Sequence, residues 1–153
     1  MKSQLEKLLA EKKNKIDENA KNYDGKKDEW IKRVGELYSS IREWLIPLEE
    51  KKYLKIETTE ISISEELLGQ YRIKKMLISF FNNEKIEILP AGLYIIGGMG
   101  RVDMKLGFRN IMIVGKDKDN WEFAERLERG KPKMWDFNQD NFEAIVEEYI
   151  ESF

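Results

Sequence analysis

The spacing of apolar residues divides the chain into a helical N-terminal third, a strand-rich middle and a C-terminal helix. In the second half of residues 1–50, apolar side chains recur in steps of three and four, which is typical of one face of a helix. They are Trp30, Val34, Leu37, Tyr38, Ile41, Trp44, Leu45 and Leu48. We expect Pro47 to end or kink this helix one turn after Trp44.

A weaker helical pattern precedes it, with a thin apolar stripe among many charged residues. The stripe consists of Leu5, Leu8, Leu9, Ile16, Ala20 and Tyr23. The segment NYDGKKDEW predicts a break, because Gly25 suits the position after a helix end and Asp28 suits an N-cap. Residues 1–50 are therefore predicted to form a helical hairpin. Its first arm has too little apolar surface to lie in a core along its whole length.

From about residue 53 the apolar period changes to two, which indicates strands. Short runs rich in Ile, Tyr, Phe and Val are separated by turn-prone segments such as NNEK, PAG and GKDKDN. Turns at intervals of roughly 8–12 residues favour an antiparallel meander of about six or seven strands. The segment SEELLGQ fits either a single helical turn or a continued strand.

The last predicted element is an amphipathic helix that Asn138 can cap. Its apolar stripe consists of Phe142, Ile145, Val146, Tyr149, Ile150 and Phe153. Such a stripe should pack on one face of the sheet. The predicted fold class is therefore α+β: a helical hairpin over residues 1–50, then an antiparallel sheet and a C-terminal helix over 51–153, in one folded unit.

Composition narrows the function by exclusion. The chain has 153 residues, of which 37% are charged, and 27 basic residues against 29 acidic ones give a net charge of −2. This balance argues against a dedicated DNA-binding or membrane-coating protein. The sequence contains no cysteine and no histidine, so disulfides, thiolate metal sites and Ser-His triads are excluded. An enzyme would depend on carboxylates, Lys, Tyr or a carboxylate-bound Mg²⁺.

The N-terminal stretch MKSQLEKLLAEKKNK is too polar for a signal peptide. No apolar run approaches the roughly 18 residues that a membrane-spanning helix needs. We therefore expect a small soluble protein of the cytoplasm that does not associate with membranes.

The segment LYIIGGMGRVDMKLGF, residues 93–108, is the main candidate for a ligand site. A phosphate-binding loop needs Gly-x-x-x-x-Gly-Lys-Ser/Thr leading into a helix. Here the spacing differs, no Lys-Ser/Thr pair follows, and the next residues alternate as a strand. In a structural interpretation, the glycines allow the chain to reverse in a hairpin turn. Arg101 and Asp103 then lie side by side on the polar face of the strand as an ion pair. The alternative is an anion site formed by Gly98, Gly100 and Arg101, with Asp103 orienting the arginine.

The same motif carries a resemblance. Gly97, Gly100, Arg101, Val102 and Asp103 form a Gly-x-x-Gly-Arg-Val-Asp pattern, which PAG precedes and a C-terminal IVEEYI helix follows. In these features the chain resembles a family of small uncharacterised bacterial proteins. The resemblance implies no activity and no catalytic residues.

Two further chemistries find little support. A restriction-type nuclease needs acids on adjoining strand ends, and Asp103 has no acid-x-Lys partner on the next strand, NIMIVGK. Base stacking needs exposed aromatic side chains among basic ones, and Trp135 lies near a basic segment, residues 126–133. Packing of the tryptophans against the sheet or a helix is the simpler interpretation.

The C-terminal segment from Met134 to Phe153 contains six acids and no Lys or Arg. Acids in the last turn of a helix oppose its dipole. The basic segment 126–133, solvation or a basic partner surface could offset them. With no convergent reactive set, we expect a non-enzymatic protein-interaction protein of the accessory, inhibitor or immunity-like kind.

Its partner would be another protein, with a second copy of the chain as one candidate. The expected contact residues are Leu5, Leu9, Ile16, Glu147, Glu148 and Glu151. No cofactor and no metal site are expected, nor is a nucleic-acid partner. Two alternatives stay open: a nucleotide or nucleic-acid binding module that uses the glycine turn and Arg101, and a metal-dependent phosphodiesterase centred on Asp103.

Overall fold

The computed structural model describes residues 3–94 and 99–153. Within them a long helix, α1 (Gln4–Glu50), precedes a seven-stranded sheet, and a second helix, α2 (Gln139–Glu151), follows it. The strands are β1 (Leu54–Glu65), β2 (Gly69–Phe80), β3 (Lys85–Gly92), β4 (Arg101–Leu106), β5 (Arg109–Gly115), β6 (Trp121–Glu125) and β7 (Lys133–Asp136). Each strand pairs antiparallel with the next one along the chain. The predicted α+β class, the meander and the C-terminal helix are confirmed.

The N-terminal region is one continuous helix of 47 residues, so the predicted helical hairpin is wrong. Gly25 and Asp28, the expected break and N-cap, both lie inside α1. A glycine in a helix interior costs only about 1 kcal/mol relative to alanine. A break would instead expose unpaired backbone groups at two new helix ends. An ion pair between Asp24 and Lys27, at 3.5 Å, spans the glycine.

The helix also runs through Pro47 and ends at Glu50. Proline near a helix end disturbs few backbone hydrogen bonds, and the Lys51 N–H still donates to the Pro47 carbonyl at 3.3 Å. The chain leaves the helix at Lys52, whose φ of 64° is in the left-handed region.

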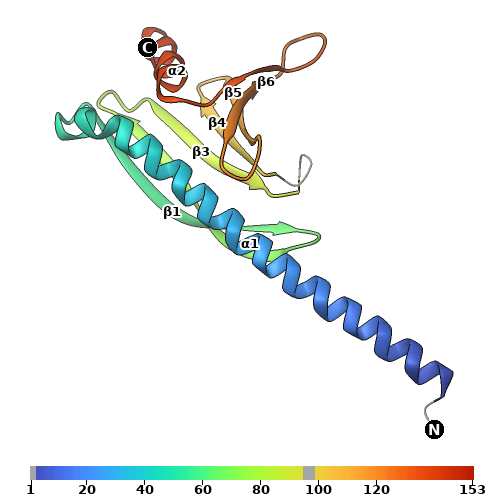
Figure 1. Cartoon of the computed structure of the whole chain (residues 1–153). Coiled ribbons are helices and arrows are strands. Elements are labelled where there is room, and N and C mark those ends of the chain that lie inside the picture. Colours follow the sequence, from blue (N-terminus) through green and yellow to red (C-terminus); the bar gives the residue numbers. More distant parts are fainter. Residues whose placement is uncertain (1–2, 95–98) are drawn as a thin grey trace.

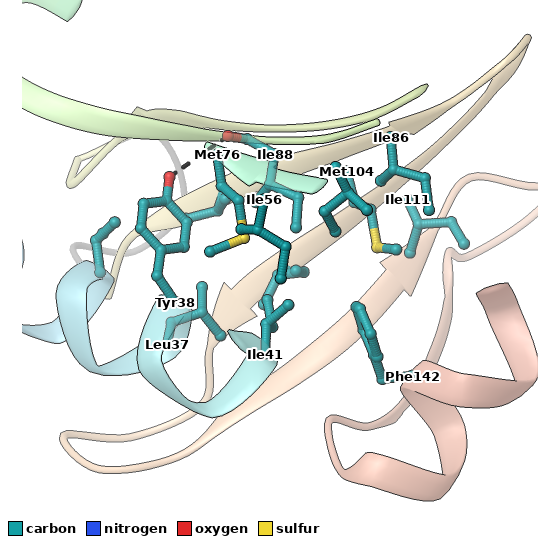
Figure 2. Close-up of a cluster of buried hydrophobic side chains, with 14 of the residues drawn as sticks. Leu37, Tyr38, Ile41, Ile56, Met76, Ile86, Ile88, Met104, Ile111 and Phe142 are labelled. Atoms are coloured by element: carbon teal, nitrogen blue, oxygen red, sulfur yellow. Dashed lines mark hydrogen bonds between the residues drawn. The ribbon is translucent and has the colours of Figure 1, made fainter. Parts of the chain in front are cut away.

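The C-terminal half of α1 lies along β1 and β2, and α2 covers the same side of the sheet near its other end (Figure 1). Between these layers is one hydrophobic core with side chains from both helices and from the sheet (Figure 2). Ile41 of α1, Ile88 of β3 and Phe142 of α2 are each 0% exposed. The predicted seam of α1 is confirmed as core, with Trp44 and Leu48 half-buried at its margin.

Helix α2 begins as predicted, with the Asn141 N–H donating to the Asn138 side chain at 2.8 Å. Four residues of its predicted stripe are buried: Phe142, Ile145, Val146 and Tyr149. The other two, Ile150 and Phe153, are 40% and 44% exposed. The apolar stripe is therefore wider than the face of α2 that the sheet covers.

The N-terminal part of α1 extends away from the sheet and from α2 (Figure 1). Every side chain of residues 4–18 is exposed, and Tyr23 is partly buried. The expectation that this part is not a core helix is confirmed. No helix within the described residues has both the length and the apolar character needed to cross a membrane.

Candidate functional site

The predicted glycine turn lies between β3 and β4, and α1 packs against its base. The Gly100 N–H donates to the Leu93 carbonyl at 3.1 Å, and the Gly100 carbonyl accepts from the Gly115 N–H at 3.0 Å. Gly100 has a φ of +92°, and a Cβ at this position would lie 2.2 Å from the Trp30 ring. Glycine is needed here for its backbone conformation and for the close approach of α1.

A carboxylate holds the start of the same turn. Glu65, at the end of β1, accepts from the backbone N–H groups of Leu93 at 2.9 Å and Tyr94 at 3.0 Å. It also accepts from the Tyr71 hydroxyl, whose oxygen accepts from the Trp30 indole N–H at 3.0 Å. Burial, reinforced by the bond to Glu65, raises the pKa of Tyr71. This network joins α1, the β1–β2 hairpin and the turn into one unit.

Arg33 of α1 braces the other side of the turn. Its guanidinium donates to the Met99 carbonyl at 2.9 Å and to the Asp117 carbonyl at 3.2 Å. It also lies 4.7 Å from the centre of the Trp121 ring, within the range of a cation–π interaction. Partial burial lowers the pKa of Arg33. The Arg33 guanidinium is thus held by three contacts within the chain.

Arg101 and Asp103 form the ion pair that their spacing predicts. Arg101 Nε lies 2.7 Å from one Asp103 carboxylate oxygen, and Nη2 lies 3.0 Å from the other. The bond to Asp103 raises the pKa of Arg101. Val102 and Met104, which alternate with the pair along β4, are buried in the core beneath the helices. The pair therefore lies on the face of the sheet opposite α1.

Gly100 and Arg101, two described residues of the predicted anion site, lie on different sides of the sheet. Gly100 faces Trp30 on the α1 side of the sheet, whereas Arg101 points to the other side. Gly98 lies outside the described residues. Both carboxylate oxygens of Asp103 accept hydrogen bonds from Arg101, and the positive charge of this guanidinium disfavours a metal cation beside the carboxylate. The described residues contain no cluster of three or more acids that could hold one.

A cleft of about 390 Å³ lies beside the turn, and sequence reasoning did not predict it. Its lining includes Lys26, Glu29, Arg33, Tyr94 and Lys118. Glu29 and Lys118 lie 4.0 Å apart, and Arg33 is bonded to the backbone as described. Among the described residues of the lining, the structure shows no hydrogen bond between a nucleophile and a base.

The predicted contact residues near the N-terminus are the most exposed large apolar side chains of α1. Leu5, Leu9 and Ile16 are 68%, 63% and 67% exposed. Leu8, which the predicted set omits, is 46% exposed beside them. With 3.6 residues per turn, the four side chains lie on one side of the helix.

The acidic contact residues lie on α2, far from these leucines (Figure 1). Glu148 accepts from Arg109 of β5 at 2.7 Å, and the same guanidinium holds Glu125 of β6 through two further bonds. Arg109, rather than the basic segment 126–133, thus offsets one acid of α2. Glu147 and Glu151 are exposed. The two halves of the predicted interface are therefore separate surfaces.

No protein-family model, curated protein or solved structure matches this chain. The resemblance carried by the Gly-x-x-Gly-Arg-Val-Asp pattern stays a prediction. The function has to be argued from the chain's own residues.

Proposed function

We propose that this chain is a non-enzymatic protein-interaction protein whose binding surface is the exposed N-terminal part of α1, residues 4–18, called the arm below. The observation that carries the proposal is the exposure of four large apolar side chains on one side of a helix that extends beyond the sheet. Contiguous exposed apolar surface of this kind typically marks a contact with another molecule.

The arm is encoded as a helix by its own residues. Ser3 accepts from the Glu6 N–H at 3.2 Å, and Ser-x-x-Glu is the sequence of a capping box. The negative charge of Glu6 in the first turn interacts favourably with the helix dipole. The residues that follow are mostly Leu, Lys, Glu and Ala, the strong helix formers. The sequence thus specifies a helix that covers no part of the chain's own core.

The arm continues a helix whose other half is packed on the sheet, but its own exposed turns gain no stability from burial. Burying a leucine or isoleucine side chain completely contributes roughly 1.5–3 kcal/mol. A partner that covers the apolar side of the arm would therefore stabilise both the helix and the complex.

The two alternative functions have less support. An anion-binding module would need Gly100 and Arg101 on one side of the sheet, and they lie on opposite sides. A phosphodiesterase would need a free carboxylate at Asp103, and Arg101 occupies it. Mg²⁺-dependent phosphodiester cleavage that is lost in Asp103→Asn would contradict the proposal.

The proposal is tested by affinity capture from the cells that make the protein, with two matched variants. Leu5→Glu/Leu9→Glu adds two negative charges on the apolar side of the arm, four residues apart. Ala10→Glu/Asn14→Glu adds the same charges at the same spacing on the opposite side.

We expect the first variant to lose the proteins captured by the wild type, because its carboxylates would have to be buried. The second variant should retain them. If both variants capture the same proteins as the wild type, the arm is not the binding surface.

A further inference from the structure

The charges around the apolar side of the arm also indicate what covers it. Taking 3.6 residues per turn, Leu5, Leu9, Lys12 and Ile16 lie in one line along the helix, with Leu8 beside it. Lys12 is thus the single charged residue in the middle of the apolar stripe. A polar residue in such a seam determines which pairings of helices are tolerated.

We infer that the arm pairs with the arm of a second copy of this chain, in antiparallel orientation. The inference rests on the proposed function, since it names the partner of the same surface. Lys12 decides the orientation. In a parallel pair in register, the two Lys12 side chains would face each other and two ammonium groups would repel in a partly dry seam.

The antiparallel pairing removes this conflict. When Leu5 of one copy lies opposite Ile16 of the other, Lys12 lies opposite Leu9. The aliphatic part of Lys12 can then cover the leucine while its ammonium group stays in water. The arrangement is symmetric about the point between Ala10 and Glu11, so each contact occurs twice.

Charge complementarity supports the same alignment. Glu6 and Lys13 lie on the same flank of the apolar stripe. Antiparallel packing brings equal flanks of two helices together, so Glu6 of each copy comes within reach of Lys13 of the other. A single alignment thus places Leu5 opposite Ile16 and Glu6 near Lys13.

The fold leaves room for this pair. In the alignment given, Ser3 of one copy lies opposite Glu18 of the other, and the partly buried Tyr23 lies beyond the paired segment. The two sheets then lie at opposite ends of the helix pair and do not collide. An interface of two short helix faces falls below the roughly 1,200 Å² of stable complexes, so the dimer should be weak and dependent on concentration.

Sedimentation equilibrium of the full chain tests the inference. We expect a reversible monomer–dimer equilibrium that Leu5→Glu/Leu9→Glu weakens by at least about tenfold and Ala10→Glu/Asn14→Glu leaves unchanged. Glu6→Lys alone should weaken the dimer, and Glu6→Lys/Lys13→Glu should restore it. A dimer that ignores the leucine variant overturns the inference, and so does a failure of the double charge exchange to restore it.

Orientation is measured separately, because the chain contains no cysteine and a single one can be introduced for a spin label. Labels on Asn22→Cys should lie about 35 Å apart along the axis of an antiparallel pair, but roughly 10 Å apart in a parallel pair. A short distance overturns the inference. A wild type that is monomeric at all concentrations also overturns the inference. The capture experiment then remains the test of the proposed function.

Discussion

Trp30 of α1 lies directly against Gly100 of the β3–β4 turn, so closely that a Cβ on the glycine would lie 2.2 Å from the ring. The indole N–H of Trp30 also begins the hydrogen-bond chain through Tyr71 to Glu65, which holds the first residues of the turn. The position of the helix and the backbone conformation at Gly100 are therefore determined together. Gly100 and Glu65 thus serve the fold.

The first prediction concerns Gly100. Gly100→Ala should destabilise the fold, because the added methyl group overlaps Trp30 at a backbone φ of +92°. Gly130→Ala is the matched control, since Gly130 has a φ of +89° with no atom near its Cβ position. The difference in stability between the two variants, measured by thermal melts, gives the cost of the overlap with Trp30. We expect Gly100→Ala to lose about 1–3 kcal/mol more than the control. Equal losses would mean that backbone strain alone is responsible.

The second prediction concerns Glu65. Glu65→Gln replaces the carboxylate that accepts from two backbone N–H groups with a neutral amide, which weakens both hydrogen bonds and should cost about 1–3 kcal/mol. Hydrogen exchange at the Leu93 and Tyr94 amides should accelerate. Glu60→Gln is the control, because Glu60 is exposed on the same strand and forms an ion pair with Arg72 at 3.0 Å. Unchanged exchange at Leu93 and Tyr94 would show that the carboxylate does not hold the turn.

The third prediction is a loss of stability in alkaline solution. Tyr38 is 5% exposed and donates to the Lys74 carbonyl at 2.7 Å, and burial raises its pKa above the ordinary value of 10. The neutral phenol is thus favoured in the folded chain. Its contribution is complete below pH 10 and declines as pH rises, by up to about 1.4 kcal/mol per pH unit. Urea unfolding of Tyr38→Phe should show a shallower decline above pH 10 than the wild type. Equal declines of stability with pH in the wild type and the variant would show that Tyr38 does not cause the loss.

The fourth prediction separates the two ends of the apolar stripe on α2. Phe142 is 0% exposed and packs against Trp44, whereas Phe153 is 44% exposed. Phe142→Ala should cost about 3–5 kcal/mol, and Phe153→Ala considerably less. Chemical denaturation of both variants checks the difference. Similar losses would show that the helix end is as firmly packed as its beginning.

The alternation of apolar residues predicts most strands well, because a meander brings neighbouring segments together and buries mainly one face, although β5 is buried on both. Arg101 and Asp103 could be paired from sequence for the same reason, since residues two apart share a face. The break at Gly25 was predicted wrongly because a glycine signal is weak. Its cost in a helix is about 1 kcal/mol, which the hydrogen bonds of a continuous helix outweigh.

The brace around the turn could not be predicted. Glu65 binds a backbone amide 28 positions away, and Arg33 binds a carbonyl 66 positions away. Such contacts leave no periodic pattern, because they depend on how the hairpins and α1 come together in space. The exposed arm was predictable in part, since its thin stripe and dense charges excluded it from the core.

The central claim is that another protein chain covers the leucine side of the arm. Backbone hydrogen exchange of residues 5–16, followed from dilute to concentrated solution, tests it most directly. We predict protection that grows with concentration in the wild type and in Ala10→Glu/Asn14→Glu, but not in Leu5→Glu/Leu9→Glu. Rapid exchange of the arm in all three proteins at every concentration would contradict self-association. Identical capture of partner proteins by all three would then contradict the claim itself.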